Sequence, residues 1–159
     1  MKTKLFFAAL VAFLCLSTVS YSQEYHSEYS VGYSVGVGDW AIDRINVQTI
    51  QGLRFSDNLT AGIGIGLDYY NDSENFMMPI TINAKAYLPT SDNFAPFASL
   101  DLGYGIGITE SISGFTITPA VGIKAGKFMA QIGYNSQKLS EDGISLNMGA
   151  FQMKIGLMF

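Results

Sequence analysis

Few side chains in this chain of 159 residues could carry out acid–base or metal chemistry. The sequence contains one histidine, His26, and one cysteine, Cys15, and charged residues make up 14% of it, whereas soluble domains average about 25%. One histidine and one cysteine do not supply the ligand sets of the usual zinc sites. We therefore predict that the chain is not an enzyme and binds no metal or cofactor. We expect His26 to be an exposed tail residue.

Four charged residues interrupt segments in which large apolar residues alternate with small or polar ones. They are Asp101, Lys85, Lys124 and Lys154. Successive side chains of a strand point to opposite faces, so all four would lie on the polar face of their strands. A buried carboxylate is costly without a partner, so we expect Asp101 and Lys85 to pair at similar depth, with Lys124 nearer one end. We predict a structural role for this polar network; a proton or ion path is the alternative.

The alternation that positions these residues recurs in eight segments. It is clearest over 60–69, where isoleucine and leucine at odd positions alternate with glycine, threonine and aspartate at even ones. A side-chain period of two is typical of a strand with one apolar face. Two segments deviate, since Thr49 and Gln51 fall on the apolar face and Pro119, which cannot donate a ladder hydrogen bond, predicts a bulge or a frayed start. Strands are predicted over 29–38, 45–55, 59–70, 80–88, 97–109, 115–125, 128–137 and 146–159.

The connections indicate the fold class. Short turns at 56–58, 90–93 and 126–127 alternate with longer connections, as in outer-membrane barrels. The longer connections are 39–44, 71–78, 110–114 and 138–145. We predict an all-β fold, an eight-stranded antiparallel up-and-down transmembrane β-barrel, with both termini and the short turns facing the periplasm. Eight strands enclose a space that side chains can fill, so a porin channel is not expected. The predicted inward residues are Gly62, Gly64, Gly66, Asp68, Thr81, Asn83, Lys85, Ser99, Asp101, Gly103, Gly105, Gly107, Lys124, Gln131, Asn135, Gln152 and Lys154.

The N-terminal segment has the layout of a secretory signal. Two lysines precede an apolar run at 5–16, and the small residues Ser20 and Ser22 precede a predicted cleavage site before Gln23. We predict a signal peptide over 1–22, a barrel domain over 23–159 and a location in the outer membrane. Removing both lysines takes the net charge from −4 to −6, which argues against a nucleic-acid partner.

Aromatic residues gather at the predicted strand ends. Aromatic side chains favour the membrane interfaces, so two girdles are expected. At the periplasmic end they would comprise Tyr29, Phe55, Phe94, Phe97, Phe128 and Phe159, and at the outer end Trp40, Tyr69, Tyr70, Phe76 and Phe115.

Several segments together resemble a known family. They are GYSVGVGDW (32–40), GIGIGLDYY (62–70), MPITINAKAYL (78–88), PFASLDLGYGIG (96–107) and TPAVGIKAG (118–126). The chain is similar to the small outer-membrane β-barrel family of Gram-negative bacteria, which includes the OmpX, OmpA-transmembrane and opacity-type barrels, and to its PorT-like proteins. The resemblance implies membrane lipid as a partner. It also implies that the barrel-assembly machinery recognises the last strand through the terminal aromatic, Phe159.

The resemblance carries no catalytic motif, so function is predicted more coarsely than fold. The leading interpretation is a non-enzymatic role in membrane stability or surface contact. One alternative is an accessory barrel of a protein export or assembly machine, as in the PorT-like proteins. Another is a soluble periplasmic calycin-like barrel, which would carry its apolar side chains inside and bind an apolar ligand. A lipid-modifying enzyme is the least favoured, because it would need a histidine near the lipid face.

Overall fold

The computed structural model describes residues 24–38, 41–71, 74–88, 93–109, 113–141 and 144–159, without the side chains of 140, 141, 144 and 145. The predicted signal peptide and the girdle residue Trp40 lie outside these ranges. No helix within the described residues is long and apolar enough to cross a membrane. The strands are β1 (Glu24–Val37), β2 (Arg44–Ser56), β3 (Leu59–Tyr70), β4 (Asn75–Tyr87), β5 (Phe94–Gly107), β6 (Ser113–Ala125), β7 (Phe128–Glu141) and β8 (Ile144–Met158).

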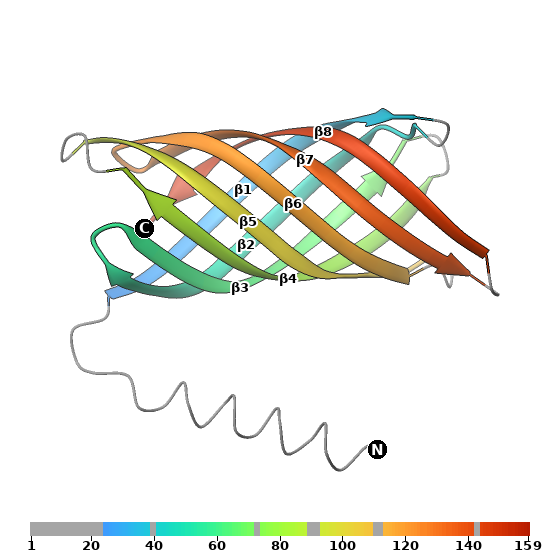
Figure 1. Cartoon of the computed structure of the whole chain (residues 1–159), viewed down its shortest axis with the longest axis horizontal. Coiled ribbons are helices and arrows are strands. Elements are labelled where there is room, and N and C mark those ends of the chain that lie inside the picture. Colours follow the sequence, from blue (N-terminus) through green and yellow to red (C-terminus); the bar gives the residue numbers. More distant parts are fainter. Residues whose placement is uncertain (1–23, 39–40, 72–73, 89–92, 110–112, 142–143) are drawn as a thin grey trace, which may run out of the picture.

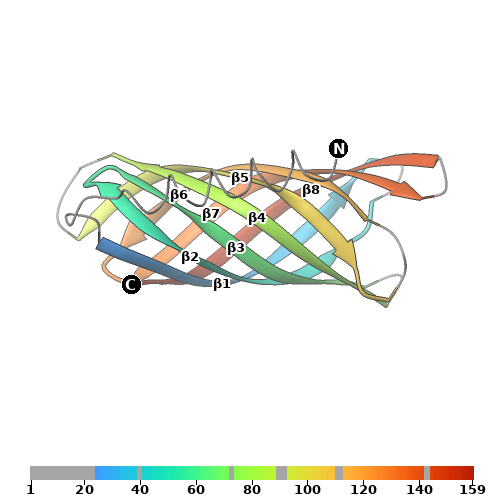
Figure 2. The same ribbon diagram turned by 90° about the horizontal axis from the view of Figure 1, so that it is seen from below.

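The strands close into one antiparallel barrel in chain order, with β1 paired to β8 (Figure 1). The predicted fold class, an eight-stranded up-and-down barrel, is confirmed. Following the paired residues once around the barrel leads from Ser27 to Val37, a stagger of ten residues along β1. A stagger of this kind tilts the strands against the barrel axis, and Figures 1 and 2 show that tilt.

The predicted contrast in connection length between the two ends is wrong in two places, because β4–β5 spans 88–93 whereas β7–β8 spans only 142–143. The end that we call the short-turn end holds the start of β1, the end of β8 and the connections β2–β3, β4–β5 and β6–β7 (Figure 1). The other connections lie at the opposite, long-loop end. There the strands extend further than predicted, since β4 begins at Asn75 and β7 continues to Glu141. Half of the predicted connection 71–78 and most of 138–145 are therefore strand, because strand pairing continues past the apolar part of each segment.

Pro119 does not cause the predicted bulge or frayed start. The register of β6 against β7 is the same before and after it, and Pro119 remains paired with Leu100 of β5. A proline removes only one backbone hydrogen-bond donor from the ladder. The paired residues on either side of Pro119 are enough to keep the register. The register shift lies instead between Arg54 and Ser56, at the β2–β3 turn.

The alternation along each strand separates an apolar outer wall from a polar interior. On β3 the side chains of Ile63, Ile65 and Leu67 are exposed, whereas the alternate residues Gly64 and Asp68 are buried. The calycin-like alternative required apolar side chains inside, which is the reverse of this arrangement. An alanine at position 64 would crowd polar side chains from two neighbouring strands, so this glycine leaves room for longer side chains in the interior.

Candidate functional site

The interior of the barrel contains the charged groups with the closest contacts. Lys85 of β4 places its Nζ 2.7 Å from Oε2 of Glu28 on β1, and each side chain is 1% exposed. The Lys85 ammonium also lies 5.7 Å from the centre of the Phe97 ring. Burial of both charges is costly unless they are paired, so this ion pair is a structural requirement of the interior.

The predicted ion pair between Asp101 and Lys85 is wrong. Asp101 instead lies 3.8 Å from the ammonium of Lys154, and Asn83 stands between the predicted partners. The Asn83 amide donates to Asp101 at 2.5 Å and accepts from Lys85 at 3.3 Å. The reason is the register, because Asn83 lies directly opposite Asp101 across β4 and β5, whereas Lys85 lies opposite Ser99.

The fourth residue of the predicted network, Lys124, is half-buried on β6. It pairs in register with Ala95 near the start of β5, which belongs to the short-turn end. The ion pairs between described side chains do not include it. The structure therefore brings Asp101, Lys85 and Lys154 into one connected network and leaves Lys124 beside it.

Neutral polar side chains extend this network through the middle of the barrel. Lys154 donates to Gln48 Oε1 at 2.6 Å, and the Gln48 amide donates to Thr81 at 3.2 Å. Nearby, the Ser34 hydroxyl accepts from Asn46 at 3.0 Å and from Gln152 at 3.2 Å. These contacts come from four different strands, β1, β2, β4 and β8, so the interior polar groups connect the walls of the barrel across its lumen.

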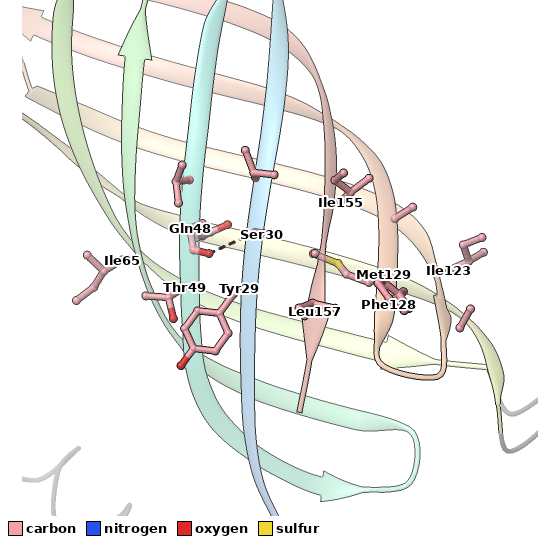
Figure 3. A pocket seen from close by; sticks show the side chains of 15 residues that line it. Tyr29, Ser30, Gln48, Thr49, Ile65, Ile123, Phe128, Met129, Ile155 and Leu157 are labelled. Atoms are coloured by element: carbon pink, nitrogen blue, oxygen red, sulfur yellow. Dashed lines mark hydrogen bonds between the residues drawn. The ribbon is translucent and has the colours of Figure 1, made fainter.

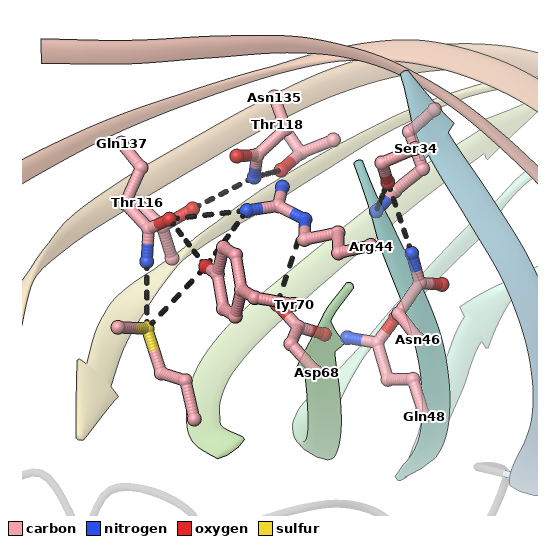
Figure 4. Close-up of polar contacts among 12 residues, drawn as sticks. Ser34, Arg44, Asn46, Gln48, Asp68, Tyr70, Thr116, Thr118, Asn135 and Gln137 are labelled. Atoms are coloured by element: carbon pink, nitrogen blue, oxygen red, sulfur yellow. Dashed lines mark hydrogen bonds and ion pairs between the residues drawn. The ribbon is translucent and has the colours of Figure 1, made fainter. Parts of the chain in front are cut away.

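A second charged cluster lies toward the long-loop end (Figure 4). Arg44 lies 3.8 Å from the Asp68 carboxylate and donates to Tyr70 Oη at 3.0 Å and to Gln137 Oε1 at 3.1 Å. The Tyr70 hydroxyl donates to the same Gln137 oxygen at 2.9 Å. Figure 4 shows these side chains converging from β2, β3 and β7. The sequence analysis did not predict Arg44 and Glu28 as inward residues, because each precedes the predicted start of its strand.

An apolar cluster lies at each end of this polar interior. At the short-turn end it comprises Tyr87, Phe97, Met129 and Met158. The cluster toward the other end comprises Tyr70, Met77 and Leu139, with Ile42 and Met148 packed against it. We call these the lower and upper apolar lids. Because water competes for exposed ion pairs, the lids strengthen the polar contacts between them.

His26 is not the exposed tail residue predicted from the sequence. It lies within β1, is 3% exposed and places Nε2 4.0 Å from Glu28 Oε2. The cause is that β1 begins at Glu24, before the predicted start at position 29, so His26 takes an inward position. In the described part of the chain, no three histidine, cysteine, aspartate or glutamate side chains are grouped as a metal site would require.

The predicted girdle residues divide between the two faces. The exposed ones are Tyr29, Phe55, Phe94, Phe128 and Phe159 near the short-turn end, and Phe76 and Phe115 near the long-loop end. Tyr69 is half-buried and contacts Phe76, with ring centres 5.0 Å apart. The prediction is wrong for Tyr70 and Phe97, because both are buried in the interior. Strand alternation turns their side chains inward, whereas their chain neighbours Tyr69 and Ala98 point outward. At the short-turn end, Lys127 lies 4.8 Å from the Phe159 ring centre.

The outer wall carries a polar stripe formed by Tyr25, Thr49 and Gln51. The Tyr25 hydroxyl donates to Gln51 Oε1, and Gln51 Nε2 donates to Thr49 Oγ1 at 2.7 Å. Thr49 also borders a shallow, mostly apolar hollow of about 800 Å³ on the same wall (Figure 3). Tyr29, Ile65 and Leu157 line the hollow as well.

Comparisons with known proteins concern the fold. No protein-family model and no curated protein matches this chain. The crystal structure of Neisserial surface protein A (NspA) matches it with a TM-score of 0.65 at 10% identity, covering 86% of this chain and 97% of that chain. The outer membrane enzyme PagL matches with a TM-score of 0.62 at 11% identity, covering 80% and 97%.

A third solved structure is the N-terminal β-barrel domain of Pseudomonas aeruginosa OprF, with a TM-score of 0.53 at 13% identity. The match covers 87% of this chain and all of that chain (100%). These neighbours are small outer-membrane β-barrels, so the fold of this chain is the one that such proteins use.

Proposed function

We propose that this chain is a small outer-membrane barrel protein with a non-enzymatic role, which stabilises the membrane or presents its loops for surface contact. The observation that carries the proposal is the inverted polarity of the barrel. Exposed isoleucine, leucine and valine side chains cover the outer wall, whereas lysine, aspartate and amide side chains are buried inside. Lipid outside the barrel favours this arrangement. The end that holds the start of β1 and the end of β8 would face the periplasm, and the opposite end the cell exterior.

We further propose that side chains fill the lumen and that it is not a porin channel. The ion pairs Glu28–Lys85 and Asp101–Lys154 cross the interior, and the two apolar lids lie beyond them. A barrel of eight strands leaves little more room than its side chains need. Porins with aqueous channels use about 16–18 strands.

The absence of enzymatic activity is part of the proposal. His26 faces the interior beside Glu28 and is buried, so it could not reach a lipid that lies against the outer wall. PagL is an outer membrane enzyme of similar fold, which makes a direct test necessary. Membrane lipids extracted from cells with and without this protein should have identical mass profiles. A mass change that depends on the protein would contradict the non-enzymatic role.

The membrane location has a simple test. Closed barrels resist SDS until they are heated and then migrate differently, so the outer-membrane fraction should show a heat-dependent shift in gel mobility. Reconstituted protein should, in addition, give planar bilayers no porin-like conductance. Recovery in the periplasmic extract without a mobility shift would overturn the proposal, whereas a shift with a large steady conductance would overturn only the filled lumen.

An accessory barrel of an export or assembly machine is a second candidate. One observation favours it, namely the polar stripe on the outer wall, because lipid tails cannot accept or donate its hydrogen bonds. A stable complex with other envelope proteins, recovered in mild detergent, would support this candidate.

A further inference from the structure

The polar stripe is unusual because of where it lies. Thr49 is near the middle of β2, and its paired neighbours on the outer wall are Tyr29 of β1 and Ile65 of β3. Both neighbours are exposed, as expected of a wall that faces lipid. An amide and a hydroxyl at this level are costly unless their hydrogen bonds are satisfied, since lipid tails offer no partner.

The stripe satisfies only part of its own hydrogen-bonding capacity. Gln51 accepts from Tyr25 and uses one amide hydrogen on Thr49. A glutamine amide has two such hydrogens, and a threonine hydroxyl donates as well as accepts. Among the described contacts, the second amide hydrogen of Gln51 and the hydroxyl proton of Thr49 have no acceptor. The stripe could therefore make further hydrogen bonds with a partner in the plane of the membrane.

The shape of the wall beside the stripe also suits a partner. The hollow that Thr49 borders extends from β3 across β2, β1, β8 and β7 to β6 (Figure 3), and the small outward residue Ala130 lines it. Small residues allow close approach between membrane segments. Larger side chains of the partner, such as those of Tyr29 and Val31, could occupy this space.

We propose that a second copy of this chain docks on this wall, centred on the polar stripe. Copies inserted in the same direction can be related by a two-fold axis only along the membrane normal, so each residue near the axis meets its own counterpart. Such a contact needs side chains that are complementary to themselves. Tyr25, Thr49 and Gln51 each donate and accept, and none is charged, whereas a lysine or aspartate would face its like charge. This inference rests on the proposed membrane location.

Single-cysteine cross-linking tests the proposal in the full chain. In a Cys15→Ala background, Thr49→Cys introduces the only thiol into the stripe, and Leu102→Cys places the matched control in the outer wall of β5, a strand that does not line the hollow. Mild oxidation in the outer membrane should link the Thr49→Cys copies into a species of twice the mass. The Leu102→Cys copies should remain monomeric. Adding Gln51→Leu should weaken dimerisation about three-fold to twenty-fold, the range expected for one hydrogen bond in a membrane.

The heat-dependent gel shift of every variant separates the two proposals. Loss of the shift in the unmodified chain would mean that the membrane barrel itself is wrong. With the shift intact, equal cross-linking at positions 49 and 102, or none at position 49, would overturn the dimer. A cross-linked product of another mass would overturn it in favour of a different protein partner. No effect of Gln51→Leu on the yield would exclude the stripe as the centre of the contact.

Discussion

The ammonium of Lys85 lies 2.7 Å from the carboxylate of Glu28, although the two residues belong to strands that are not neighbours in the barrel. Lys85 comes from β4 and Glu28 from β1, so the contact crosses the interior. Both side chains are buried, and Asn83 connects Lys85 to Asp101 on β5. One ion pair thus connects β1 across the interior to the paired strands β4 and β5.

Breaking this pair on one side should destabilise the barrel strongly. Glu28→Gln leaves the Lys85 charge buried without its partner, which costs about 3–5 kcal/mol in proteins. The double variant Glu28→Gln/Lys85→Met should recover much of that loss, since it removes both charges. Urea unfolding of the refolded barrel measures the free energies. The control is Glu24→Gln, an exposed residue of the same strand, and an equal effect of the two glutamine variants would contradict the structural importance of the pair.

A glycine beneath an aromatic ring should be sensitive to the smallest addition. A Cβ at Gly149 on β8 would clash with the hydroxyl of Tyr134 on β7, whose ring packs 5.4 Å from that of Phe151. We expect Gly149→Ala to cost about 1–3 kcal/mol through overpacking. The double variant Gly149→Ala/Tyr134→Ala should show a smaller cost than the sum of the single variants. Strict additivity in the same urea measurement would show that the two residues do not interact.

The lower apolar lid should limit passage through the barrel. Phe97 is 3% exposed and packs against Tyr87, with ring centres 5.6 Å apart. We expect Phe97→Ala to raise the conductance of reconstituted protein above that of the unmodified chain and to cost about 3–5 kcal/mol of stability. Phe128→Ala, which removes an equally large ring from the outer wall, should leave the conductance unchanged. Equal conductance of both variants would show that Phe97 does not restrict the lumen.

The hydrogen bonds that Asp43 accepts in the connection between β1 and β2 should be lost at acidic pH. Hydrogen bonds from the Tyr33 hydroxyl at 2.7 Å and the Gly36 amide at 3.0 Å hold the pKa of Asp43 below its ordinary value of 3.8. A lowered pKa means that these contacts are fully present above about pH 4 and are lost as the pH falls through the lowered pKa. The NMR shift of the Gly36 amide should follow this titration. Asp43→Asn should give a flat response, and a titration that persists in this variant would assign it to another group.

The terminal residue should matter for assembly more than for stability. The backbone of Phe159 makes two hydrogen bonds with the backbone of Ser27, at 2.8 and 2.9 Å. Because both are backbone hydrogen bonds, replacing the Phe159 side chain leaves them in place. If the assembly machinery recognises the aromatic ring, Phe159→Ser should reduce the amount of barrel in the outer membrane of cells, while purified protein still refolds in detergent. Unchanged amounts in cells would remove Phe159 from the assembly signal.

Much of the fold follows from the sequence because a closed, two-sided sheet imposes a period of two on every strand. Leu59–Tyr70 agrees with the predicted strand at both ends, since glycine and isoleucine alternate there without interruption. The early start of β1 was harder to predict. His26 and Glu28 continue the inward pattern, but Tyr25 and Ser27 on the outer side are less apolar than the residues that follow, so the hydropathy contrast fades.

The sequence by itself therefore determined which side chains face inward, because strand parity is a local property. Only the tertiary structure decided which of those side chains touch. The stagger of ten residues around the barrel and the register of each pair set their relative heights. For this reason Lys85 meets Glu28 rather than Asp101, and Arg44 meets Asp68 and Tyr70. A contact across a lumen depends on the closure of all eight strands, and no single segment of the chain encodes that closure.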